Sequence, residues 1–154
     1  MKRVAILGRG GAGKSALARR LGEITGLPVV ELDTLFWQDG LNPSEPGRWA
    51  TRQREFIERE TWITDGDLGP YDSALDERLQ AADTVVVLDF SLLRCAWRTL
   101  RRGHERADYW RWIWSYRRRY LSAVMRAIGV HAQHADVHVL RNPAAVRRFI
   151  AEIR

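Results

Sequence analysis

The chain has 154 residues, a formal net charge of +6 and a single cysteine. This length fits one domain with its own hydrophobic core, and one cysteine excludes a disulfide framework within the chain. No apolar run approaches the roughly 18–20 residues that span a bilayer, so we expect a cytoplasmic protein without a membrane partner. The positive charge favours anionic partners but does not separate nucleotides from nucleic acids.

Short apolar runs alternate with helical patterns along the chain. Strands are predicted at residues 3–7, 29–33, 61–65, 84–89 and 137–141. Helices are predicted at residues 15–24, 48–60, 72–82, 91–102, 108–128 and 143–153. This alternation is typical of parallel βαβ units. The sequence therefore predicts a single α/β domain over residues 1–154, with helices on both faces of a doubly wound sheet of five parallel strands.

A complete G-x-x-x-x-G-K-[ST] phosphate loop follows the first predicted strand and opens the first predicted helix. Its glycines let backbone N–H groups turn inward, and the helix N-terminus adds partial positive charge. We expect ATP phosphates to bind here. The predicted nucleotide-binding residues are Gly8, Arg9, Gly10, Gly11, Ala12, Gly13, Lys14 and Ser15, together with Arg141 after the fifth strand.

Within this loop two side chains have predicted roles. Lys14 is expected to reach the β- and γ-phosphates and to act in catalysis, and the Ser15 hydroxyl is expected to bind Mg²⁺. Mg²⁺ and ATP are the only cofactors that we predict.

Acidic residues end three of the predicted strands, at the edge of the sheet where ligands bind in α/β folds. Asp65 fits the acidic partner of the loop, holding Mg²⁺ directly or through water. Asp33 fits a catalytic base or hydrogen-bond acceptor for a substrate hydroxyl. Asp89 is expected to cap the helix that follows it.

The acceptor side is predicted around Asp33, Phe36 and Trp37. The two aromatic residues follow the aspartate directly and fit the lining of an acceptor pocket. Anchoring of an exposed loop is an equally good interpretation of this pair.

An arginine-rich helix follows Asp89. Its arginines share one helical face, which favours either an ordinary solvated surface or a lid over the phosphates at about residues 94–120. In the second interpretation Arg98 and Arg102 are catalytic and neutralise charge in the transition state. The four arginines of this face are Arg94, Arg98, Arg101 and Arg102.

The segment 109–120 interleaves aromatic residues with arginine. Helical spacing predicts one core stripe, formed by Trp110, Ile113, Trp114, Leu121, Val124, Met125 and Ile128. A second stripe is predicted to face a partner, a lid or a base, and consists of Trp112, Tyr116 and Tyr120. Cys95 is expected to be a small buried apolar residue.

Several blocks of the sequence resemble adenylate-kinase-related P-loop proteins often labelled DNA topology modulation proteins. The matching blocks are residues 4–15, 27–37, 62–66, 82–89, 110–114 and 137–141. This resemblance implies a nucleoside-monophosphate-kinase-like fold with strand order 2-3-1-4-5 and an arginine-bearing lid. It also implies Lys14 and Ser15 as phosphate and Mg²⁺ ligands, Asp65 as the acidic partner, and an acceptor near Asp33.

We therefore predict an ATP-dependent phosphotransferase that moves the γ-phosphoryl group to a nucleotide or another small acceptor. A nucleotide-switched protein that binds nucleic acid through residues 109–120 is the main alternative. A plain nucleoside triphosphatase is a third possibility. The acceptor itself cannot be named from these residues.

Overall fold

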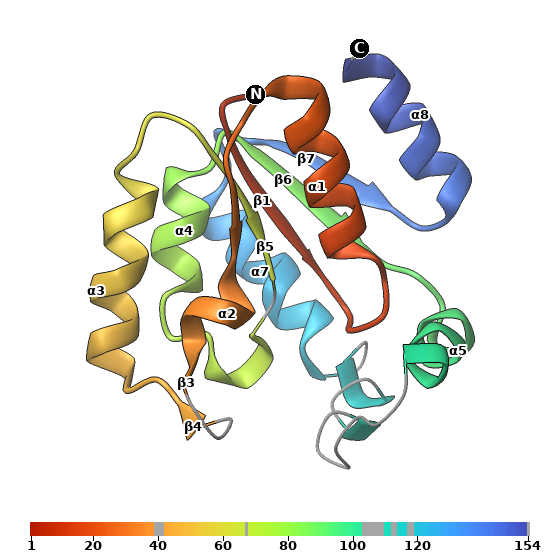
Figure 1. Cartoon of the computed structure of the whole chain (residues 1–154), viewed down its shortest axis with the longest axis horizontal. Coiled ribbons are helices and arrows are strands. Elements are labelled where there is room, and N and C mark those ends of the chain that lie inside the picture. Colours follow the sequence, from red (N-terminus) through yellow and green to blue (C-terminus); the bar gives the residue numbers. More distant parts are fainter. Residues whose placement is uncertain (39–41, 67, 103–109, 112–113, 117–118, 154) are drawn as a thin grey trace.

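The computed structural model describes residues 1–38, 42–66, 68–102, 110–111, 114–116 and 119–153. Five parallel strands form one sheet in the order β2-β5-β1-β6-β7 (Figure 1). Their bounds are β1 (Arg3–Gly8), β2 (Val29–Glu31), β5 (Trp62–Asp65), β6 (Thr84–Leu88) and β7 (Asp136–Leu140). The predicted α/β class and the strand order 2-3-1-4-5 are confirmed.

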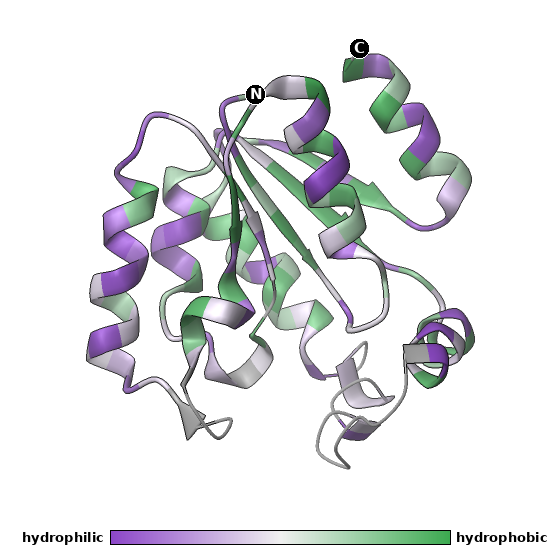
Figure 2. Ribbon diagram, in the orientation of Figure 1, coloured by the Kyte–Doolittle hydropathy of each residue, from purple (hydrophilic) through white to green (hydrophobic). Residues whose placement is uncertain are grey.

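Helices cover both faces of this sheet because the central strands are apolar on both sides (Figures 1 and 2). On β1, Ala5 and Leu7 pack in one core cluster, and Val4 and Ile6 pack in the other. The first cluster includes residues of α2 (Leu32–Phe36), α3 (Pro46–Ile57), α4 (Leu75–Ala81) and α7 (Leu121–His131). The second includes residues of α1 (Lys14–Thr25), α8 (Pro143–Ile153) and α5 (Leu92–Arg102).

The second strand is shorter than predicted. It ends at Glu31, and α2 begins at once, so Asp33 lies in a helix rather than at a strand end. Leu32 and Phe36 are buried one helical turn apart, and this pair explains why a helix forms there. A small hairpin of β3 (Trp37–Gln38) and β4 (Asn42–Pro43) follows, which the sequence analysis did not predict.

The predicted helix over residues 108–128 is divided. The described residues 110–111, 114–116 and 119 are helical, and a separate helix, α7, extends to His131. The predicted core stripe is wrong at Trp114, which is 74 % exposed, and at Met125, which is also exposed. Tyr116, from the other stripe, is buried instead, and the Arg9 guanidinium of the phosphate loop lies 5.8 Å from its ring.

The last helix begins as predicted. The Asn142 side chain accepts a hydrogen bond of 2.9 Å from the backbone N–H of Ala145, and Pro143 occupies the first helical position. Within the described residues, no helix combines the length and the apolar character that crossing a membrane requires.

Candidate functional site

The phosphate loop joins β1 to α1, and its glycines have backbone conformations that other residues rarely adopt. Gly11 and Gly13 have φ values of 76° and 99°. A Cβ atom on Gly11 would lie 2.5 Å from the carbonyl oxygen of Cys95, and one on Gly8 would lie 2.6 Å from that of Leu88. The loop can therefore keep this path only with glycine at these positions.

The first turn of α1 is open to an anion. Its N-cap residue is Gly13, which has no side chain that could cover the helix end, and the turn contains no acidic residue. The Lys14 ammonium lies back over the loop, donating to the carbonyl oxygens of Gly8 at 2.8 Å and Arg9 at 3.3 Å. Free N–H groups, the helix dipole and this ammonium are the elements that bind phosphate.

One side of α5 packs directly on the loop. Arg98 donates from Nη1 to the carbonyl oxygen of Ala12 at 3.5 Å, and a Cβ on Gly13 would lie 2.9 Å from the same nitrogen. Thr99 is also on this side, with Oγ1 2.7 Å from the position of a Cβ on Gly11. Arg98, predicted to be catalytic, therefore lies at the phosphate loop.

The other arginines of this helix differ from Arg98. Arg94 lies over the ring of Phe90, and Arg101 lies over the ring of Trp97, both on the exposed side. The predicted common face of four arginines is therefore divided between the loop and solvent. The side chain of Arg102, the second predicted catalytic arginine, falls outside the described part of the structure, and so do residues 103–109 of the predicted lid.

The pKa of the Cys95 thiol reflects the charges beside the phosphate loop. The residue is fully buried, as predicted. Burial raises the pKa of its thiol above the usual range, while Arg9, Lys14 and Arg98 act in the opposite direction. Three cationic side chains therefore act on one buried group beside the phosphate loop. Such a concentration of positive charge suits a polyphosphate.

Asp65 and Asp33 lie on neighbouring segments at the same edge of the sheet. Asp65 is buried at the end of β5, paired in register with Ile6 of β1. Gly66, which follows it, approaches α2 so closely that a Cβ would lie 2.9 Å from the Cβ of Leu32. Asp65 directly precedes Gly66 in the sequence and Asp33 directly follows Leu32, so each aspartate adjoins one residue of this contact. Asp33 itself is exposed.

The predicted acceptor-side aromatics form a cluster with two residues that the sequence analysis did not assign. Phe36 is buried, and its ring lies 5.3 Å from that of Trp49 and 5.0 Å from that of Trp37. Tyr71 completes the cluster, 5.7 Å from Trp37. Phe36 therefore belongs to the core beneath α2 and β3. Trp37 is partly accessible and Tyr71 is exposed. Tyr71 could not be found from the sequence, because no periodic pattern includes it.

Asp89 and Arg141 face each other after β6 and β7. The Arg141 Nε lies 3.9 Å from the Asp89 Oδ2, and the Asp89 backbone N–H donates to the carbonyl oxygen of Leu140. The carboxylate that was predicted as a helix cap thus has an arginine beside it. Arg141 is largely exposed.

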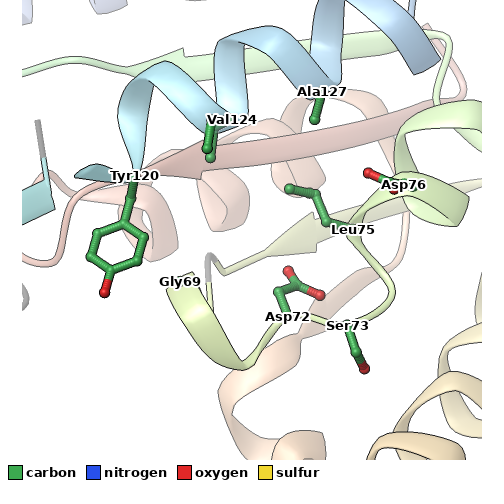
Figure 3. Close-up of a pocket in the computed structure, with 9 residues that line it drawn as sticks. Gly69, Asp72, Ser73, Leu75, Asp76, Tyr120, Val124 and Ala127 are labelled. Atoms are coloured by element: carbon green, nitrogen blue, oxygen red, sulfur yellow. The ribbon is translucent and has the colours of Figure 1, made fainter. Parts of the chain in front are cut away.

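A cavity of about 240 Å³ lies between the segment 69–76 and α7 (Figure 3). The polar residues that line it are Asp72, Ser73, Asp76 and Tyr120, and the Ser73 hydroxyl points away from the others in Figure 3. Its apolar wall comes from Leu75 and from Ala123, Val124 and Ala127 of α7. None of the residues that line it is basic.

The cavity is connected to the phosphate loop through two tyrosines. The Tyr120 ring lies 6.3 Å from that of Tyr116, and the Arg9 guanidinium lies 5.8 Å from the Tyr116 ring. On its other side the segment 69–76 includes Tyr71, which contacts the acceptor-side aromatics. The cavity therefore lies between the two predicted halves of the site.

Solved structures similar to this chain are kinases. A shikimate kinase from Acinetobacter baumannii matches with a TM-score of 0.65 and 18% identity, over 99% of this chain and 90% of that one. A deoxyadenosine kinase from M. mycoides matches with a TM-score of 0.61 and 13% identity, over 99% of each chain. A gluconokinase from Sinorhizobium meliloti 1021 matches with a TM-score of 0.57 and 17% identity, over 99% of this chain and 95% of that one.

These likenesses establish the P-loop kinase fold. No protein-family model and no curated protein matches the sequence. The narrower resemblance to DNA topology modulation proteins stays a prediction.

Proposed function

We propose that the protein is an ATP-dependent phosphotransferase that moves the γ-phosphoryl group to a small acceptor. The observation that carries this proposal is the open first turn of α1 with Lys14 and Arg98 beside it. Phosphoryl transfer depends mainly on positioning and on neutralising charge, and this arrangement supplies both. The kinase structures that share the fold support the same activity.

Mg²⁺ fits the residues at the end of the loop. Ser15 is in the first turn of α1, and Asp65 ends the adjacent strand. Among the described residues, no group of three or more His, Cys, Asp or Glu side chains is placed to hold a metal ion. Nucleotide phosphates would complete the ligand set, as is usual for Mg²⁺. The ion would neutralise phosphate charge.

Asp33 and the cavity in Figure 3 are proposed as the acceptor side. Asp76 and Tyr120 offer oxygen atoms that accept hydrogen bonds, whereas the Asp72 carboxylate is already ion-paired with the buried Arg78. None of the lining residues is basic, so the lining offers no cation to a phosphate-bearing ligand. We therefore propose a hydroxyl-bearing acceptor without a phosphate, such as a polyol or a nucleoside, in preference to a nucleotide. Asp33, which is exposed, would orient the attacking hydroxyl or accept its proton.

The two lysines of the chain provide a matched test of the activity. Lys14→Ala should abolish phosphoryl transfer from γ-labelled ATP without changing the circular dichroism spectrum. Lys2→Ala, which removes an exposed side chain bonded to Glu60, should leave transfer unchanged. Acceptors would first be selected by thermal shift with a non-hydrolysable ATP analogue present. Unchanged turnover in Lys14→Ala contradicts the proposal.

One observation favours the alternative of nucleic-acid binding. Trp114 is largely exposed, and Arg111 and Arg119, which flank it in the sequence, are exposed as well, a composition that suits stacking of unpaired bases. This alternative predicts binding of single-stranded DNA or RNA that weakens steeply with salt and changes with bound nucleotide. Trp114→Ala would abolish it and leave ATP turnover intact. ATP loss without a phosphorylated acceptor would instead indicate a plain triphosphatase.

A further inference from the structure

The side chain of Arg9, the second residue of the phosphate loop, is buried with part of its hydrogen-bonding capacity unused. The residue is 3 % exposed. Its Nε and Nη1 atoms have no hydrogen-bond partner among the described residues. An arginine stays charged in a protein, and a buried guanidinium without partners is costly. A side-chain hydrogen bond to the Cys95 sulfur and the Tyr116 ring at 5.8 Å compensate only in part, because Nε and Nη1 stay unpaired among the described residues.

The electrostatic environment increases this cost. The charged groups that act on the neighbouring Cys95 thiol are Arg9, Lys14 and Arg98, all cations. Arg9 is buried, and Lys14 and Arg98 are partly buried. Like charges gathered beside one loop repel one another, and an anion between them relieves this repulsion. The phosphate loop, which contains Arg9, is the part of the fold where such an anion binds.

We propose that the Arg9 guanidinium binds the terminal phosphoryl group of the donor nucleotide. This inference rests on the proposed function and deepens it. The loop backbone at this position belongs to the phosphate cradle, and the side chain adds a planar pair of donors that matches two phosphate oxygens. ADP lacks that group, so Arg9 distinguishes the triphosphate from the diphosphate.

The proposal makes an unusual prediction about stability. In the ligand-free protein Arg9 is a buried, incompletely paired charge, so replacing it with an apolar side chain of similar length should not lower stability. In the presence of a triphosphate the same replacement should remove stabilisation. Replacing a residue with a purely structural role should instead lower the stability of the ligand-free protein and leave the stabilisation by a triphosphate unchanged.

The test compares Arg9→Met with Arg94→Met, which removes an exposed arginine of α5. Melting temperatures and dissociation constants are measured with no ligand, with Mg·ADP and with a non-hydrolysable Mg·ATP analogue. For Arg9→Met we expect an unchanged or higher ligand-free Tm. Its affinity for the analogue should fall by about tenfold or more, the size expected for a lost charged hydrogen bond. ADP affinity should stay the same, and Arg94→Met should match the wild type throughout.

Three outcomes overturn the inference. A lower ligand-free Tm together with wild-type affinity for both nucleotides makes Arg9 structural, and the proposed function survives. If Arg9→Met does not fold, Arg9→Lys decides: an undiminished preference for the analogue over ADP contradicts the proposal, and a reduced preference supports it. If the wild type binds neither nucleotide, this inference and the proposed function fail together.

Discussion

Two buried arginines show how the two halves of the site differ. Arg78, on the proposed acceptor side, has no exposed surface, and its Nη2 lies 2.5 Å from the Asp72 Oδ2, although its Nε has no hydrogen-bond partner among the described residues. Its Nη1 also donates to the side chain of Gln53. Arg9, on the donor side, has Nε and Nη1 without a partner among the described residues. The ion pair with Asp72 indicates that the first guanidinium belongs to the fold, and the second is the one that we propose for a ligand.

The sequence repeats this contrast over longer segments. Residues 31–83, which include α2, α3 and the cavity segment, contain thirteen acidic and five basic side chains. Residues 91–126, which include α5, contain ten arginines and two acidic side chains. The modest net charge of the chain therefore hides two segments of opposite sign. A polyphosphate is attracted to one of them and repelled by the other.

The largest expected effect is on stability, from replacing the ion-paired Arg78. Arg78→Met leaves the buried Asp72 carboxylate without its partner and should lower the free energy of unfolding by about 3–5 kcal/mol. Urea denaturation measures it. Arg54→Met, which breaks an exposed ion pair with Glu77, should change stability little. A second substitution, Asp72→Asn, should restore part of the loss. An Arg78→Met protein as stable as the wild type would remove the distinction between the two arginines.

Arg98 tests the donor side through kinetics. Arg98→Ala should reduce kcat by roughly 10²–10³-fold, the usual cost of one preorganised donor in a transition state. Arg94→Ala should leave kcat unchanged, because that side chain lies over Phe90 on the exposed side of α5. Steady-state turnover with a selected acceptor measures both. Equal losses in the two variants would mean that the arginines act through net charge and not through contact with the loop.

Gly11 tests whether the donor side depends on backbone geometry. Gly11→Ala adds a Cβ 2.5 Å from the Cys95 carbonyl oxygen at a φ of 76°, so we expect a loss of about 1–3 kcal/mol and weaker nucleotide binding. Gly129→Ala in α7, where a Cβ meets open space, should instead stabilise by up to about 1 kcal/mol. Thermal denaturation with and without an ATP analogue compares the two. A Gly11→Ala protein that binds nucleotide normally would contradict the close approach of α5.

The donor side could be predicted from sequence because its chemistry is local. Residues 8–15 contain the turn, the helix start and the ammonium in one continuous segment, and the structure keeps that order. Arg98 also followed from helical spacing, although spacing alone could not show that Arg94 and Arg101 face away from the loop.

The proposed acceptor side was harder to predict because its residues come from distant segments. Asp33 lies in a helix that the apolar strand pattern concealed, and Tyr71 joins Trp37 only through the fold. The same limit applies to Tyr116. Helical periodicity placed it on an outward stripe, whereas it is buried in the fold beside Arg9, more than a hundred positions away. Short-range patterns contain no information about such contacts.

The smallest effect concerns Asp83, a carboxylate at the opposite end of β6 from the site. Burial raises its pKa, but hydrogen bonds from the Thr84 hydroxyl and from the backbone N–H groups of Lys2 and Arg3 outweigh this and hold the pKa below its usual 3.8. A lowered folded pKa stabilises the protein above pH 3.8, and this contribution is lost as the pH falls through the folded value. Asp83→Asn should therefore cost about 1 kcal/mol or less at neutral pH, and the difference from wild type should shrink below pH 3.8. Chemical denaturation at several pH values measures this difference, and phosphoryl transfer at neutral pH should be unchanged. A loss of transfer in Asp83→Asn would show that charges outside the two halves also control the site.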